Sequence, residues 1–287
     1  MAAPMPSRGT TSICALLLLA PGALAAFTAP ATRAVPAAPA ACHAHVTLIA
    51  RGQGSPDDLA WDGSTLLVTD INGGRIGAVS HGRAHTVVSH LKEPEGIVAA
   101  PGHSLIVAEQ ATNSVVEIGP HGHRITLARL PLPRGQSGLD GINADGSGAI
   151  YVPDSARGRL YVLHLGSRRL SLVGTGMIRP VAAITYGGAI VVADEYSNAV
   201  WRISHGRTEL AHVPLPDDLA VISHHLIAVS LIGQVWEVAP HLRLLSSAFG
   251  PTTTDPQGLV GSGPGAVLVA DEARNAIYRL SGLTRCL

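Results

Sequence analysis

Short apolar runs alternate with polar turns along most of this chain, and the pattern recurs roughly every forty residues. The clearest copy is residues 255–282, where a Pro-x-Gly segment leads into a short apolar run and a Gly/Ser turn. The alternating stretch AVLVAD follows, then a polar turn, and then a second alternating stretch, AIYRLSG. Alternation of this kind, interrupted by turn residues, predicts antiparallel strands and not helices.

Six copies of this unit align on their first residues, here called the opening segments. They begin at Pro56, Pro94, Leu139, Pro180, Pro216 and Pro256. Thirteen or fourteen residues after the second position of each comes an acid, or a serine in the fifth copy: Asp70, Glu109, Asp154, Asp194, Ser230 and Asp271. Five copies then carry a residue type that tolerates the positive φ of a strand-joining turn: Gly74, Asn113, Gly158, Asn198 and Asn275. Six such repeats predict an all-β, six-bladed β-propeller with four-stranded antiparallel blades.

The two ends of the chain are expected to close the ring. The sixth copy has three strands but no fourth, whereas HVTLIA (45–50) precedes the first copy and has no blade of its own. We therefore expect residues 45–50 to form the outer strand of blade six, beside the C-terminal strand.

Three copies resemble the NHL-repeat signature: YVPDSARGRLYVL (151–163), VVADEYSNAVWRI (191–203) and LVADEARNAIYRL (268–280). The Pro-x-Gly openings are similar to those of the SMP-30/gluconolactonase group of six-bladed propellers. The resemblance covers residues 45–287. It implies the propeller fold much more specifically than it implies any activity, because one fold hosts many functions.

The N-terminal residues predict export. Residues 1–26 have a positive charge at Arg8, an apolar run and the small-x-small sequence Ala23-Leu24-Ala25, as secretory signal peptides do. The apolar run is too short for a transmembrane helix. Residues 27–41 form an Ala/Pro-rich tether that we expect to be disordered, and residues 42–287 form the propeller. The expected location is secreted or extracytoplasmic.

Cys42 has two interpretations. Cys14 leaves with the signal, so Cys42 and Cys286 are the two cysteines of the mature chain, and ring closure should bring them together. An exported compartment permits a disulfide between them. The alternative is a lipid-anchored Cys42, since residues 39–42 loosely resemble a lipobox. We favour the disulfide.

Composition argues against nucleic acid as a partner. Lys plus Arg equals Asp plus Glu at 20 each, and aromatic residues make up only 3% of the chain. A neutral chain with few aromatics offers neither an obvious basic face nor a stacking platform for bases. The 14 histidines fall mostly in turns away from the predicted axis. We expect a monomer that binds a small molecule, glycan or peptide.

Candidate chemistry lies in the second positions of the opening segments, which should ring the mouth of the central channel. These positions are Asp57, Glu95, Asp140, Val181, Asp217 and Gln257, with Asp58 and Asp218 adjacent. Converging carboxylates repel one another and require water or a cation, and hard oxygen ligands suit divalent cations. The alternative is that these acids cap turns or line a solvated channel.

The resemblance to the SMP-30 group adds a specific ligand set. That group binds its metal with a Glu, two Asn and an Asp at the openings of blades one, three, four and five. The counterparts by position are Asp57, Asp140, Val181 and Asp217. Val181 cannot bind a metal, although Glu95 could substitute from blade two. On this interpretation one divalent cation (Ca²⁺, Mn²⁺ or Zn²⁺) is bound.

Two functions from different classes follow. The leading hypothesis is an exported NHL-type propeller that binds a small ligand, glycan or peptide on the face formed by the opening loops. The alternative is a divergent metal-dependent lactone or ester hydrolase, with Asp218 or Glu95 as the base. A third possibility is a propeller lyase of the virginiamycin B lyase type, for which no residue constellation argues.

The acids at the end of the second strand of the repeat (Asp70 and its equivalents) are called the second ring. They recur in nearly every blade and are expected to be structural.

Overall fold

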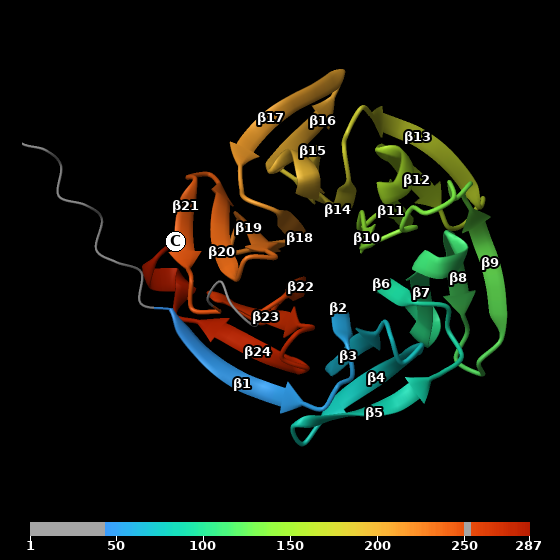
Figure 1. Ribbon diagram of the computed structural model, residues 1–287, viewed down its shortest axis with the longest axis horizontal. Coiled ribbons are helices and arrows are strands. Elements are labelled where there is room, and N and C mark those ends of the chain that lie inside the picture. The colour runs from blue at the N-terminus through green and yellow to red at the C-terminus, as the bar shows by residue number, and fades with distance from the viewer. Residues whose placement is uncertain (1–43, 250–253) are drawn as a thin grey trace, which may run out of the picture. The chain divides into compact units, whose positions relative to one another are not determined.

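The computed structural model describes residues 44–249 and 254–287. Within these ranges, twenty-four strands form six four-stranded antiparallel sheets, arranged as the blades of a propeller around a central axis (Figure 1). The predicted fold class, blade number and strand number per blade are confirmed.

Each blade runs from an inner strand at the axis to an outer strand at the rim. Blade one is β2 (Pro56–Asp62), β3 (Thr65–Asp70), β4 (Arg75–Ser80) and β5 (Arg83–Val88). Blade two is β6 (Pro94–Ala100), β7 (Ser104–Glu109), β8 (Ser114–Ile118) and β9 (Arg124–Arg129). Blade three is β10 (Asn143–Ala144), β11 (Ala149–Asp154), β12 (Arg159–His164) and β13 (Arg169–Thr175).

The second half of the ring repeats this order. Blade four is β14 (Pro180–Tyr186), β15 (Ala189–Asp194), β16 (Ala199–Ser204) and β17 (Gly206–His212). Blade five is β18 (Pro216–Ile222), β19 (His225–Ser230), β20 (Gln234–Ala239) and β21 (Arg243–Ser246). Blade six is β22 (Pro256–Gly261), β23 (Ala266–Asp271), β24 (Ala276–Ser281) and β1 (His45–Arg51). Short 3₁₀ turns are η1 (Pro101–His103), η2 (Gln110–Thr112), η3 (Ser155–Arg157), η4 (Glu195–Ser197) and η5 (Leu283–Arg285).

The ring closes as predicted. Strand β1 pairs antiparallel with β24, in a register that places Val46 opposite Leu280. The sheet order β1-β24-β23-β22 makes the N-terminal strand the outer strand of the last blade. Because β1 from the N-terminal end completes the blade formed by the three C-terminal strands, its pairing with β24 closes the ring.

The hydrophobic core lies between neighbouring blades. Leu67 and Ile76 of blade one pack in one cluster with Leu105 and Val107 of blade two, and similar clusters fill the other gaps. Because both faces of each sheet are covered, the second strand of each blade is apolar on both sides. Strand β23 of blade six, for example, is buried at every position. This explains the near-continuous apolar runs in the sequence.

The acids of the second ring fix the opening loops. Asp70 accepts hydrogen bonds from the backbone N–H of Ser55 and of Gly73, both at 2.9 Å, and Asp194 accepts one from Arg179 N at 2.7 Å. In blade five, Ser230 donates its hydroxyl to the carbonyl of Pro214 instead. In these three blades the group therefore anchors the residues just before its own inner strand, as a structural role requires, whereas Asp154 of blade three accepts from Arg157 instead.

The N-terminal predictions fall outside the described part of the chain. The signal peptide (1–26), the tether (27–41) and Cys42 all precede Ala44. Within the described residues, no helix has the length and apolar character needed to cross a bilayer.

The closure of the ring generates a prediction about Cys42 and Cys286. Cys286 is buried in a cluster with Phe249 and Leu283, and Ala44, two residues after Cys42, packs against the same cluster. We expect non-reducing mass spectrometry of the mature protein to show a peptide that joins the two cysteines. Reduction should then destabilise the fold by up to roughly 4–5 kcal/mol, because the bond closes a loop of almost the whole propeller. Acylation of Cys42 would contradict the disulfide.

Candidate functional site

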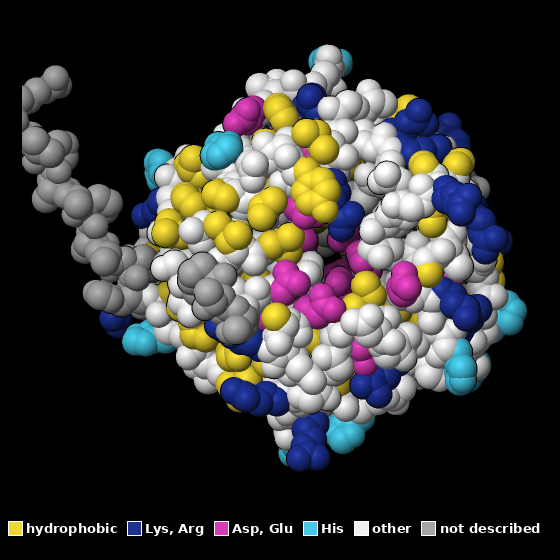
Figure 2. Space-filling model, in the orientation of Figure 1, with side chains coloured by type: hydrophobic (Ala, Val, Ile, Leu, Met, Phe, Trp, Pro, Cys, Tyr) yellow, Lys and Arg dark blue, Asp and Glu magenta, His cyan; other side chains and the backbone are white. Residues whose placement is uncertain are grey.

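The opening segments place four predicted site residues together at the axis. Asp57, Glu95, Asp140 and Asp217 stand at the start of four inner strands or their loops, and each is no more than 7% exposed. Figure 2 shows acidic side chains lining the hollow at the centre of this face. The sequence-based expectation that these carboxyl groups converge is thus met.

Asp58 and Asp218 have a different role from their neighbours. The Oδ1 atom of Asp58 accepts the N–H of Leu59 at 2.7 Å, and its Oδ2 atom accepts the N–H of Ile97 in blade two at 2.9 Å. Asp218 repeats this arrangement: it accepts from its own neighbour and from Leu259 in blade six, both at 2.7 Å. Each carboxyl group therefore links the inner strands of two adjacent blades.

Asp58 and Asp218 are the third residues of their opening segments, and glycine occupies this third position in three other blades for a steric reason. A Cβ on Gly96 would lie 2.4 Å from the backbone nitrogen of Ile142, and one on Gly258 would lie 2.4 Å from the carbonyl oxygen of Asp57. Where neighbouring inner strands approach this closely, only glycine fits.

The predicted role of Asp218 as a base stays a prediction. Both of its carboxyl oxygens are already hydrogen-bonded, so Asp218 would have to release one of these contacts to act as a base.

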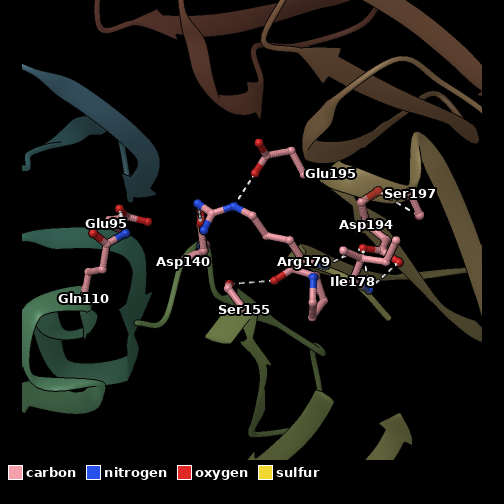
Figure 3. A network of polar contacts seen from close by, with 11 residues as sticks. Glu95, Gln110, Asp140, Ser155, Ile178, Arg179, Asp194, Glu195 and Ser197 are labelled. Carbon is pink, nitrogen blue, oxygen red and sulfur yellow. Dashed lines mark hydrogen bonds and ion pairs between the residues drawn. The ribbon is translucent and has the colours of Figure 1, made fainter. Parts of the chain in front are cut away.

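Arg179 is a residue of the site that the sequence analysis missed (Figure 3). Its Nη2 atom lies 2.7 Å from Oδ2 of Asp140, its Nε atom donates to Glu195, and its guanidinium carbon lies 5.5 Å from the ring centre of Tyr196. It precedes Pro180 in blade four, the blade whose second position is Val181. Among the six residues that precede the opening segments, Arg179 is the only cation, and this was the available signal.

Burial dominates the electrostatics of the axis. It raises the pKa of Asp57, Glu95 and Asp217 well above the ordinary range, and the charge of Asp140 raises each of them further. Burial likewise raises the pKa of Asp218 to about 7, although two backbone N–H groups oppose the shift. For Arg179, burial lowers the pKa but Asp140 and Glu195 raise it by more. One guanidinium cannot balance this many carboxyl groups, so the axial acids hold their protons to a higher pH than separate carboxyl groups would.

Asp57 and Asp217 are distinctive because their carboxyl groups have no partner. Within the described residues, no hydrogen bond or ion pair reaches either side chain, although each residue is 7% exposed. Both line a small cavity on the axis, together with Asp140, Val181 and Gln257. The cavity is about large enough to hold one water molecule. Two carboxyl groups that accept no hydrogen bond from the described residues and face such a space are chemically suited to a small positive charge.

The metal centre implied by the SMP-30 resemblance does not fit these residues. Val181 is apolar, and Asp140 is held in an ion pair with Arg179. Across residues 44–249 and 254–287, no three His, Cys, Asp or Glu side chains are grouped as metal ligands. A guanidinium of the chain itself thus binds the carboxylate at one of the positions that correspond to metal ligands in the SMP-30 group.

Apolar side chains are exposed beside the acidic hollow. Ile178 is 60% exposed, Tyr196 58% and Ile232 37%, and all three lie in turns on the side of blades four and five where the opening loops meet. We call these three residues the apolar shelf. The loop of residues 130–138, which joins blades two and three, also lies on this side, where Leu132 and Gln136 line a shallow depression with Gln110.

Comparison with known proteins identifies structural neighbours only. No family model matches the chain, and no curated protein matches it by sequence. A gluconolactonase from Xanthomonas campestris superposes with a TM-score of 0.67 at 15% identity, covering 83% of this chain and 89% of its own. A streptogramin B lyase gives a TM-score of 0.62 at 12% identity, covering 84% and 99%. Virginiamycin B lyase from Staphylococcus aureus gives 0.60 at 12%, covering 83% and 99%. These neighbours confirm the propeller resemblance, and at such identities they establish the fold alone.

The contrast between adjacent residues Asp217 and Asp218 gives a test. Because the folded state raises the pKa of Asp217, it binds a proton more tightly than the unfolded state does. The free energy of unfolding therefore falls as the pH rises from the unfolded pKa towards the folded pKa. We expect Asp217→Asn to stabilise the protein by roughly 1–3 kcal/mol at about pH 8, and to have little effect at about pH 4.

The matched variant Asp218→Ala should act in the opposite direction. It removes the acceptor for two backbone N–H groups, which costs roughly 1–3 kcal/mol at about pH 5, where repulsion among the axial acids is small. Urea denaturation monitored by circular dichroism measures both variants. Equal signs for the two substitutions at their stated pH values would show that the proposed division of roles is wrong.

Proposed function

We propose that this chain is an exported β-propeller that binds a small ligand on the face formed by the opening loops. We further propose that the ligand carries a positively charged group which enters between Asp57 and Asp217. The observation that carries the proposal is that these two buried carboxyl groups line one cavity without any donor. Export is inferred from residues 1–26.

A cation would relieve the main energetic cost of the axis. An ionised carboxyl group that is buried without a partner costs several kcal/mol, and a bound positive charge offsets this cost. Arg179 provides an internal example, since Asp140 and Glu195 stabilise its guanidinium at the edge of the same acidic group. An ammonium or guanidinium group on a ligand would find the same chemistry at Asp57 and Asp217.

The apolar shelf supplies a place for the rest of the ligand. Tyr196 belongs to it and also lies against Arg179, so the shelf adjoins the acidic axis. Exposed aliphatic and aromatic side chains beside a convergent polar group are typical of small-molecule sites. The preferred ligand therefore combines one cationic group with an apolar body.

The metal-dependent lactone or ester hydrolase remains the second candidate. The gluconolactonase among the structural neighbours favours it, and Asp57 and Asp217 occupy two of the positions at which that group has metal ligands. Val181 and the engagement of Asp140 by Arg179 weigh against it. No catalytic step through a metal follows from the residues present.

Ligand-observed NMR on the mature protein tests the proposal with n-butylammonium, n-butylguanidinium and uncharged n-butanol as probes. We expect the two cations to bind and butanol not to bind. Affinity should increase from about pH 6 to about pH 8, because a cation binds the deprotonated carboxylates. The double variant Asp57→Asn/Asp217→Asn should weaken binding at least about tenfold, whereas Asp62→Asn, at a less buried acid, should not.

Calorimetric titration of the chelator-treated protein with Ca²⁺, Mn²⁺ and Zn²⁺ separates the two candidates. Stoichiometric binding of one of these ions that disappears in Asp217→Asn, without binding of the organic cations, would replace the proposal with the hydrolase. Absence of binding by all probes would contradict a cationic ligand at the axis.

A further inference from the structure

The charges of this nominally neutral protein are segregated by burial. All twenty Asp and Glu residues lie in the described ranges, and thirteen of them are buried, which leaves seven that are exposed or half-buried. None of the eighteen Lys and Arg residues in those ranges is buried. The formal net charge of zero therefore conceals a surface that is clearly positive.

Few of the surface cations are neutralised. Five arginines form ion pairs with buried acids: Arg75, Arg157, Arg179, Arg243 and Arg274. The other thirteen described Lys and Arg residues have no ion pair with Asp or Glu, and they face only seven surface acids. A positive surface attracts anions over several ångströms and raises their rate of association.

The excess is concentrated on the rim of blades two and three. Six arginines without an ion pair lie on β9, on the loop after it, on β12, on the turn before β13 and at the start of β13. We call them the arginine strip: Arg124, Arg129, Arg134, Arg159, Arg168 and Arg169. Blades two and three are consecutive in the ring, so β9 and β13 follow one another along the rim (Figure 1). Figure 2 shows a run of basic side chains along this part of the rim.

Almost no acid compensates the arginine strip. Of the acids in residues 119–178, Asp140 and Asp154 are buried, and the third, Asp145, accepts hydrogen bonds from Ser147 and Ala149 within its own turn. Glu117 on β8 is half-buried. The six arginines thus have no acidic counterion nearby among the described residues.

We propose that the arginine strip binds an acidic polysaccharide. Guanidinium groups form paired hydrogen bonds with carboxylate and sulfate groups, which such polymers carry at regular intervals. A flexible chain can follow a curved rim across two blades. Leu172 and Val173, which are exposed on β13, offer apolar surface for the CH faces of sugar rings. This surface is separate from the axis and does not depend on the function proposed for the axis.

The arginine strip fits other polyanions less well. Nucleic-acid surfaces pair positive charge with aromatic platforms, but Tyr151 is buried and Tyr161 is half-buried, with its hydroxyl accepting from Arg157 at 3.3 Å. Trp201 of blade four is covered by Arg207, whose guanidinium carbon lies 4.1 Å from the ring centre. A flat anionic bilayer would meet only part of a convex rim.

Affinity measurements with four polyanions test this proposal. The mature protein is titrated calorimetrically with a heparin oligosaccharide, an oligogalacturonate, single-stranded DNA of matched charge and phosphatidylglycerol vesicles, with neutral dextran as a blank. We expect at least one acidic oligosaccharide to bind about tenfold more tightly than DNA or vesicles. The triple variant Arg129→Gln/Arg168→Gln/Arg169→Gln should lose about tenfold and show a weaker dependence on salt.

The matched control is Arg51→Gln/Arg83→Gln/Arg285→Gln, which removes three exposed arginines of blades one and six and their C-terminal extension. It should change the affinity less than about twofold. An equal loss in both triple variants would overturn the assignment to the arginine strip. Tighter binding to DNA or vesicles, or no binding of either oligosaccharide, would overturn the assignment to polysaccharide. Asp57→Asn/Asp217→Asn should leave polysaccharide binding unchanged.

Discussion

Six inner strands converge on one axis, and this convergence determines what the second residue of each opening segment can be. Side chains at these positions share a narrow space with little access to solvent, so their charges interact strongly. In this chain, four of the six positions are acidic, and one blade contributes Val181 together with the neighbouring Arg179. The axis is consequently a buried acidic cluster with one internal cation. The proposed cation site on the opening face depends on the carboxyl groups that this internal cation does not pair with.

Some carboxyl groups of the cluster have hydrogen-bond or ion-pair partners within the described part of the protein, and others have none. Asp58 and Asp218 link adjacent blades through backbone N–H groups, and Asp140 holds Arg179. Asp57 and Asp217 remain without a donor. The same burial that creates this cluster withdraws negative charge from the surface, so the acidic axis and the basic rim are two results of one arrangement. A neutral composition thus coexists with two oppositely charged surfaces.

The sequence predicted the fold well because the determinants of the fold are local and repeated. Opening prolines, alternating strands and the turn residues Gly74 or Asn113 recur in register, and the missing fourth strand of the sixth copy indicated that β1 closes the ring. The sequence also placed the candidate acids correctly. It could not show that Arg179 turns towards Asp140, nor that Asp218 is engaged by Leu259 from the next blade, because these contacts join residues far apart in the chain.

The expectation that the chain has no basic face came from composition, which counts buried and exposed charges equally. Since acids are needed inside each blade and at the axis, they are removed from the surface selectively, whereas arginines such as Arg168 remain exposed. Repeat architecture makes this effect systematic, because one buried acid recurs in most blades. Surface charge in such proteins depends on burial and cannot be taken from net charge.

The ionisation of Asp57 and Asp217 can be measured directly by ¹³C NMR titration of selectively labelled aspartate, with Asp57→Asn and Asp217→Asn used to assign the signals. Buried carboxyl groups without a partner should titrate well above the value of about 3.9 for a free aspartate, and n-butylammonium should move that titration to lower pH. Titration of both groups at the ordinary value, unchanged by the cation, would contradict an unsatisfied acidic axis as the ligand site.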